Sequence, residues 1–230
     1  MNDLFLSSAT LGVVISLLFY EIGLQLRKKF DSPFVNALLI AIVLTICFLL
    51  VTRVEYSSYM HSAQYLSYLL TPATVSLAIP LYEKIKLLKE NLLSILISIL
   101  AGCIASLSSI LLFSVLFKFS HAEYVTFLPK SITTAIGMSV SEELGGNTSI
   151  TVAVIIITGI FGNIIAESFL KLIKVKQPIA RGLAIGTASH AIGTSKAMEM
   201  GEVEGAMSSL AIVISGIITV VLANLFVLFY

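Results

Sequence analysis

Residues 181–196 read RGLAIGTASHAIGTSK, a stretch of small and hydroxyl-bearing residues inside an otherwise strongly apolar chain. Small residues let helix backbones approach closely, and Ser and Thr hydroxyls bond across helices. Because glycine weakens a helix, we expect interruptions here, at Gly186 and Gly193. A broken helix at membrane depth is tolerated only against protein or a water-filled cavity. His190 and Lys196 are costly in a membrane, which indicates a functional site, although a tight helix-packing seam would use the same residues.

The composition identifies the class of protein. Of 230 residues, 57% are hydrophobic and 12% are charged, whereas soluble domains carry about 25% charged residues. We therefore expect an integral membrane protein in contact with the lipid bilayer. The net charge of +1 gives no basic field for nucleic acid. Cys47 and Cys103 lie within apolar runs and are expected to be buried apolar residues, not disulfide partners or metal ligands.

The hydropathy pattern predicts an all-α membrane fold with about seven to eight hydrophobic helical segments, since a spanning helix needs about 20 apolar residues. Asp3 and the lack of an N-terminal cationic region argue against a cleaved signal peptide. We expect one polytopic domain over residues 1–230, with two helices in 1–60, a turn at 31–33, and repeated units of a broken helix and a spanning helix in 62–230. The uncharged runs are Leu4–Tyr20, Ser32–Thr52, Ser62–Tyr82, Leu92–Phe117, Thr148–Ala166 and Gly205–Tyr230.

The segment Pro129–Glu143 is too short and too polar for an ordinary lipid-facing span. Three dense cation clusters, at residues 27–29, 84–89 and 171–181, fall on one side only if this segment enters the membrane and returns to its own face. The positive-inside rule therefore favours a re-entrant segment, with the N-terminus outside. A segment that spans remains the alternative.

Three hydroxyl-rich segments resemble one another. They start at Leu70, Leu128 and Gly186, 58 residues apart in both steps, and each is followed by a charged turn and a long apolar helix. Besides the two glycines, the residues expected to break the helices are Pro72, Pro80 and Pro129. The spacing indicates internal duplication, unless the likeness is chance similarity among small-residue helices. Repeats with broken helices are typical of transporter binding sites at mid-membrane.

Two cations within these segments are candidates for binding a carboxylate. Arg181 would bind the carboxylate with two parallel hydrogen bonds, or serve only as a cationic anchor beside Lys171–Lys176. Lys130 follows Pro129 at a helix start, where a lysine also reaches easily to the membrane interface.

The candidates for proton coupling are His190, Glu142 and Glu143. A packing role for His190, and an interfacial role for the two glutamates, are the alternatives. The hydroxyls that would replace a substrate's hydration shell are those of Thr71, Thr74, Ser131, Thr133, Thr134, Thr187, Ser189 and Thr194. Each of these also suits helix packing. We find no enzyme signature and expect no catalytic residue, metal or cofactor.

Longer motifs in the same segments resemble the LrgB/CidB family. The matching runs are TPATVSLAIPLY at 71–82, LPKSITTAI at 128–136, EELGG at 142–146, PIARGLAIGTASHAIGT at 178–194, KAME at 196–199 and EGAMSSL at 204–210. The resemblance covers nearly the whole chain and is closest to CidB-type bacterial members.

The resemblance implies a multi-pass protein of the bacterial inner (plasma) membrane, paired with a small LrgA/CidA-type membrane protein. It also implies either of two functions. Some members are described as holin-like or antiholin-like modulators of murein hydrolase activity and autolysis. Related members carry small carboxylates such as pyruvate or glycolate. We expect a transporter or channel for small monocarboxylates, proton-coupled and homo-oligomeric, with a holin-like structural role as the alternative.

Overall fold

The computed structural model of the chain describes residues 1–30 and 35–230, without the side chains of Leu70 and Thr74. The described residues form helices and no strand, so the predicted all-α fold is confirmed. The chain divides into two compact units, unit 1 at Met1–Ser76 and unit 2 at Leu77–Tyr230. The turn expected at residues 31–33 lies outside the described residues.

Unit 1 contains α1 (Asn2–Ser7), α2 (Leu11–Lys29), α3 (Ala37–Thr52), α4 (Tyr56–Tyr68) and α5 (Leu70–Ser76). The prediction of one helix over Leu4–Tyr20 is wrong, because Ser8 adopts an extended backbone and its hydroxyl accepts a hydrogen bond from the Leu11 amide. This bond satisfies one of the free amides that open α2. Cys47 is exposed on α3, contrary to the expectation of burial, whereas Cys103 in unit 2 is buried.

Both prolines of the run Ser62–Tyr82 lie in the first turn of a short helix, Pro72 in α5 and Pro80 in α6 (Ala78–Glu83). Proline is tolerated there because the first amides of a helix have no intrahelical partner. The run is therefore divided among α4, α5 and α6, and the expected interruption is present.

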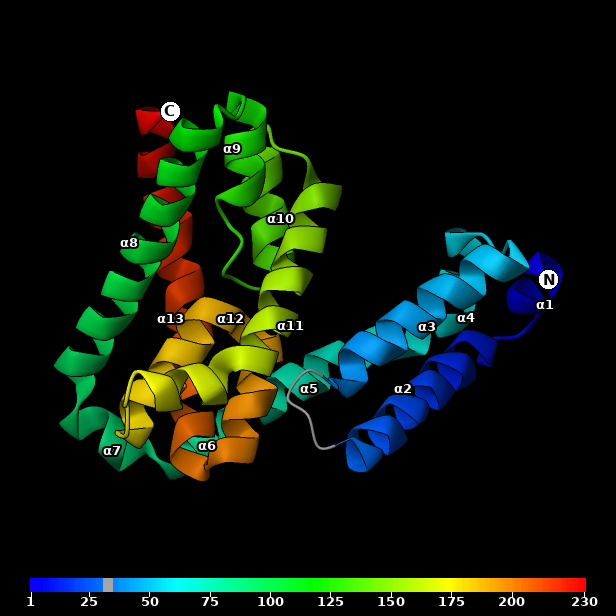
Figure 1. Ribbon diagram of the computed structural model, residues 1–230, viewed down its shortest axis with the longest axis horizontal. Coiled ribbons are helices and arrows are strands. Elements are labelled where there is room, and N and C mark those ends of the chain that lie inside the picture. The colour runs from blue at the N-terminus through cyan, green and yellow to red at the C-terminus, as the bar shows by residue number, and fades with distance from the viewer. Residues whose placement is uncertain (31–34) are drawn as a thin grey trace. The chain divides into compact units, whose positions relative to one another are not determined.

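Unit 2 continues with α7 (Ile85–Glu90), α8 (Leu92–Phe117), α9 (His121–Phe127), α10 (Thr134–Glu143), α11 (Thr148–Leu172), α12 (Pro178–Met200), α13 (Glu202–Phe226) and η1 (Val227–Phe229). Among the described residues, three helical stretches are long and apolar enough to cross a membrane: Leu92–Phe117, Thr148–Leu172 and Glu202–Phe229. The helices α8 and α13 run in the same direction (Figure 1). Cys103 lies near Ser215 partway along both helices, and the Tyr230 hydroxyl donates to the Ser114 carbonyl near their ends.

Residues 121–143, which we call hairpin A, fold back on themselves. The α9 helix leads inward from the end of α8, the chain turns at residues 128–133, and α10 returns (Figure 1). After the return, the Asn147 amide donates to Thr126 Oγ1 at 2.8 Å, so the chain is again beside α9. The turn reaches Ser106, eleven residues or roughly 16 Å from the end of α8 at a rise of 1.5 Å per residue. The segment predicted to re-enter therefore does fold back.

The α12 helix forms a second folded-back segment, which we call hairpin B. His190 has φ 42° and ψ −140°, which breaks α12 into two arms. Eight residues of straight helix span roughly 12 Å, yet a Cβ placed on Gly193 would lie only 3.1 Å from the Ile185 side chain. The second arm therefore folds back beside the first. Arg181 near the start of α12 pairs with Glu204 in the first turn of α13. Hairpin B therefore begins and ends at the same end of unit 2.

The two hairpins enter unit 2 from opposite ends. Hairpin A follows the C-terminal end of α8, whereas hairpin B follows α11, which runs in the opposite direction to α8 (Figure 1). A long helix followed by a hairpin thus occurs twice with inverted orientation. The predicted repeats that start at Leu128 and Gly186 both fall at the turning points, 58 residues apart.

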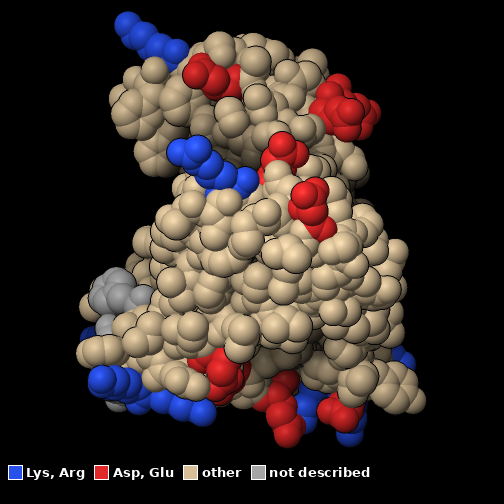
Figure 2. All heavy atoms as spheres, turned by 90° about the vertical axis from the view of Figure 1, so that its right-hand side faces the viewer, with Lys and Arg blue, Asp and Glu red and all other residues tan. Residues whose placement is uncertain are grey.

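The surface of the molecule suits a lipid environment. Figure 2 shows a face on which Lys, Arg, Asp and Glu are few and most of the surface is uncharged. Large apolar side chains are exposed along the three long helices, among them Leu116, Ile157 and Ile217. Apolar side chains of this kind are stable in contact with lipid tails, which supports the assignment to the membrane.

Candidate functional site

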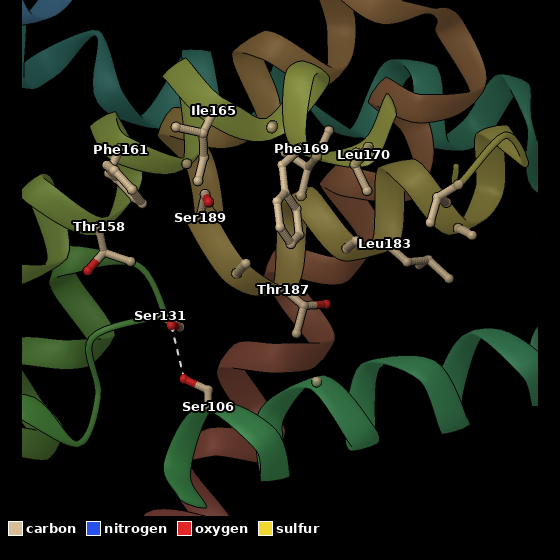
Figure 3. A pocket seen from close by; sticks show the side chains of 18 of the residues that line it. Ser106, Ser131, Thr158, Phe161, Ile165, Phe169, Leu170, Leu183, Thr187 and Ser189 are labelled. Atoms are coloured by element: carbon tan, nitrogen blue, oxygen red, sulfur yellow. Dashed lines mark hydrogen bonds between the residues drawn. The ribbon is translucent and has the colours of Figure 1, made fainter. Parts of the chain in front are cut away.

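A cavity of about 640 Å³ lies in unit 2 where the turning points of both hairpins approach α8 and α11 (Figure 3). Its polar lining comes from Ser98, Ser106, Lys130, Ser131, Thr158, Thr187 and Ser189, and its apolar lining includes Phe161, Ile165, Ala166, Phe169, Leu170, Leu183 and Ala184. Small-molecule sites typically have volumes of roughly 300–1,000 Å³, with a mainly apolar lining and a few polar groups. The cavity has both properties.

Lys130 supplies the cation in the cavity lining. Its Nζ donates to Ser131 Oγ at 2.9 Å and to Ser106 Oγ at 3.3 Å, and the two hydroxyls are themselves 3.0 Å apart. Figure 3 shows this serine pair bridging α8 and hairpin A. Within residues 77–230, Lys130 has no carboxylate partner for an ion pair. A half-buried cation whose partners are only neutral hydroxyls attracts an anion.

Hairpin B contributes two buried hydroxyls to the lining, those of Thr187 and Ser189, whose residues are 6% and 4% exposed. Within the described chain, Thr187 Oγ1 has no hydrogen-bond partner. Ser189 packs so closely on α11 that a Cβ at Gly162 would overlap its Oγ. Because Gly162 has no side chain, the first arm of hairpin B can approach α11 closely beside the cavity.

The opposite side of the cavity is a hydrocarbon wall. Phe161, Ile165 and Phe169 project from α11, and Leu183 lies on the first arm of hairpin B (Figure 3). These four side chains offer no hydrogen bond. The cavity thus has its charge at Lys130 and an apolar wall along α11, with further hydroxyls at Ser98, Thr158, Thr187 and Ser189.

His190 forms the turning point of hairpin B and does not line the cavity. Its Nε2 lies 2.9 Å from the Ile155 carbonyl, which can only accept, so Nε2 carries a proton and donates. The break therefore lies at His190, between the two predicted positions, while Gly186 and Gly193 remain helical. These glycines act through close packing instead, Gly186 against α13 and Gly193 against the first arm.

Arg181 also lies outside the cavity. Its Nη1 is 3.3 Å from Glu204 Oε1, and both side chains are largely buried between α12 and α13. The Thr194 hydroxyl donates to the His190 carbonyl and lies 2.7 Å from Ser208 Oγ. Arg181 and Thr194 thus join hairpin B to α13, and neither is placed to contact a ligand in the cavity.

The remaining candidates of hairpin A flank the cavity without lining it. Pro129 opens the turn before Lys130, Thr133 is the residue that caps α10, and Thr134 begins that helix. Glu142 and Glu143 are exposed at the far end of α10.

The candidates of the first repeat belong to unit 1. Thr71 is exposed in α5, and the side chain of Thr74 lies outside the described part of the chain. Thr71 is not among the described residues that line the cavity, all of which belong to unit 2. Of the predicted binding residues, the structure brings together Lys130, Ser131, Thr187 and Ser189.

Sequence reasoning missed Ser106, Thr158 and the hydrocarbon wall. Ser106 belongs to a serine-rich stretch of α8, which was a usable signal, but Thr158 and the wall lie in an ordinary apolar span. Among the described residues, no three His, Cys, Asp or Glu side chains come together as metal ligands would.

Comparisons with known proteins place the chain in a family. The chain is 38% identical over 224 residues to the holin-like protein CidB of Staphylococcus epidermidis, covering 96% of this chain and 97% of that protein. It is 36% identical to CidB of Staphylococcus aureus over 100% of both chains, and 38% identical to the antiholin-like protein LrgB of Bacillus subtilis over 94% of both. None of the solved structures matches the chain. The family model described as LrgB-like matches residues 16–229, and the chain therefore belongs to the LrgB-like family of membrane proteins.

Proposed function

We propose that this protein is a membrane transporter or channel for small monocarboxylates such as pyruvate, lactate or glycolate, and not an enzyme. The observation that carries the proposal is Lys130, which has only serine partners within residues 77–230, in a cavity between two opposed hairpins. The cation and its serine pair would hold the substrate carboxylate through charge-assisted hydrogen bonds.

The arrangement of the hairpins supports transport rather than binding alone. Opposed broken helices around a central site are typical of secondary transporters, in which one repeat moves against the other to open the site to either side. The second arm of each hairpin, α10 and the part of α12 after His190, begins near a turning point. The partial positive charge of these helix starts favours an anion nearby.

The cellular context is part of the proposal. The protein would lie in the bacterial inner (plasma) membrane as a multi-pass homo-oligomer, together with a small LrgA/CidA-type partner. Transport would be coupled to protons. Of the candidate proton carriers, His190 is hydrogen-bonded through its ring to the Ile155 carbonyl. Glu142 and Glu143 are exposed on the surface.

The test is uptake of radiolabelled pyruvate, lactate and glycolate into proteoliposomes, with and without a pH gradient, and with and without the partner. We expect saturable uptake that the gradient stimulates. Replacing Lys130 with Met removes an interaction of roughly 2 kcal/mol, so affinity should fall about 30-fold. The matched control is Lys176→Met, which removes an exposed cation outside the cavity and should leave uptake unchanged.

A holin-like structural role is the second candidate, and the names of the staphylococcal relatives favour it. A structural role predicts release of large trapped dyes and no selectivity among acids. It also predicts that Lys130→Met behaves as the wild type. Selective uptake that depends on Lys130 would exclude the structural role as the primary function.

A further inference from the structure

We infer that the ligand of this cavity is a monocarboxylate with a branched or extended hydrocarbon tail, such as a 2-oxo acid of five or six carbons. This inference rests on the proposed function and specifies its substrate class. The carboxylate would lie at Lys130 and the tail along the wall formed by Phe161, Ile165, Phe169 and Leu183.

The size of the cavity leaves room for a ligand larger than pyruvate. Even at the roughly 30 Å³ that liquid water occupies per heavy atom, the six heavy atoms of pyruvate would fill roughly 180 Å³. The cavity measures about 640 Å³. A ligand of pyruvate size would leave much of the wall uncovered on the cavity side, whereas a longer tail would contact it.

The distribution of polar groups determines where the carboxylate and the tail lie. Lys130, Ser106 and Ser131 are linked by hydrogen bonds at one side of the cavity. Ala184 lines the cavity one turn of α12 before Thr187, on the side away from the turning point of hairpin B. The tail would therefore extend from Lys130 past Thr187 toward Ala184.

The charges in the lining exclude a second carboxylate. Within residues 77–230, Lys130 is the cation of the cavity lining, and the wall opposite offers no donor. A dicarboxylate would have to desolvate its second charge among hydrocarbon and neutral hydroxyls, with no second cation of this lining to pair with it. A 2-oxo acid with an apolar tail avoids this cost.

The experiment measures binding of four 2-oxo acids to the purified full chain in lipid nanodiscs. The series is pyruvate, 2-oxobutanoate, 4-methyl-2-oxopentanoate and 2-oxoglutarate. Burial of each added carbon should tighten binding about fourfold. We expect 4-methyl-2-oxopentanoate, with three added carbons, to bind roughly 60-fold tighter than pyruvate at full burial, and 2-oxoglutarate to bind at least about 100-fold weaker than 4-methyl-2-oxopentanoate.

A variant that fills the tail region gives an independent readout. Ala184 is exposed to the cavity, so a phenylalanine there has room to occupy the path of the tail. Ala184→Phe should lower the preference for 4-methyl-2-oxopentanoate over pyruvate to about fivefold or less, that is, by at least about 1.4 kcal/mol. The control Ala153→Phe places the same side chain at an exposed position of α11 outside the cavity, and should leave the preference unchanged.

Each outcome is informative. Pyruvate binding as tightly as 4-methyl-2-oxopentanoate, or a preference that survives Ala184→Phe, would overturn the inference while leaving a carboxylate transporter in place. If neither acid binds, or if Lys130→Met binds both as well as the wild type, the proposed function fails together with the inference.

Discussion

Replacing Gly186 with Ala tests how closely hairpin B packs on α13. A Cβ at this position would lie 2.8 Å from Ala211 Cβ and 2.9 Å from Ser208 Cα, and closer still to the Ser208 carbonyl oxygen. Carbon atoms in favourable contact are about 3.5–4.0 Å apart. Two of the three contacted atoms belong to the α13 backbone, so the helices would have to separate by roughly 1 Å.

The magnitude follows from two opposing terms. Overpacking costs about 1–3 kcal/mol, and contact with backbone favours the upper half of that range. Alanine recovers about 0.8–1.0 kcal/mol of helix propensity. Gly186→Ala should therefore destabilise the protein by about 1–2 kcal/mol.

Gly216→Ala is the matched control in α13. A Cβ there would meet only the tip of the Ile136 side chain, at 3.0 Å, and that tip can move. The same gain in helix propensity should leave Gly216→Ala neutral or up to about 1 kcal/mol more stable. The two variants should therefore differ by about 1–3 kcal/mol, which at roughly 2–4 °C per kcal/mol for a chain of this size separates their midpoints by about 2–12 °C.

The chain contains no Trp, so unfolding is best followed with a thiol-reactive fluorophore that labels Cys103 as it becomes exposed. The exposed Cys47 must first be replaced with Ala. Equal midpoints for the two variants, or a higher midpoint for Gly186→Ala, would refute the close packing of hairpin B on α13.

Three further predictions concern stability. Arg181→Ala leaves Glu204 buried without its ion-pair partner and should lower the stability by about 3 kcal/mol in the same thermal assay. The double variant that also carries Glu204→Gln should recover part of this stability. An unchanged midpoint in Arg181→Ala would contradict the pairing. Thr187→Val removes a buried hydroxyl that has no partner among the described residues and should raise stability by about 1 kcal/mol, so a lower midpoint would show that the hydroxyl is satisfied. Ser120 donates to the Glu123 carboxylate and lowers its pKa; this stabilisation of α9 is complete above the ordinary carboxyl pKa of 4.5 and is lost as pH falls through the lower folded value. The protection of the α9 amides, measured relative to their intrinsic exchange rates at the same pH, should therefore fall at acid pH, and Glu123→Gln should not show this fall.

The sequence predicted the interruptions well, because glycines, prolines and hydroxyl-rich segments are unusual in a membrane span. The 58-residue spacing of Leu128 and Gly186 also pointed to two structurally equivalent turns. The position of the break within α12 was not predictable, since a positive φ is unfavourable for a histidine and sequence reasoning favours glycine. His190 holds this conformation while bonded to Ile155 of another helix.

The site was predictable only in part. Lys130 stood out because a cation in a hydroxyl-rich apolar segment is costly. The role of Arg181 depended on Glu204, 23 residues further along the chain, and no local pattern indicates that pairing. The hydrocarbon wall was hidden because Phe161 and Phe169 look alike in sequence whether they face lipid, protein or a cavity.

The proposed transport requires that the two hairpins enter the membrane from opposite sides. Single cysteines in a background without Cys47 and Cys103 test this, with an impermeant maleimide applied to sealed vesicles of known orientation. We predict that Ser120→Cys and Asn147→Cys, which flank hairpin A, are labelled from one side of the membrane. Gln177→Cys and Gly201→Cys, which flank hairpin B, should be labelled only from the other side. Labelling of Ser120→Cys and Asn147→Cys from opposite sides would mean that hairpin A spans the membrane, and would contradict the account.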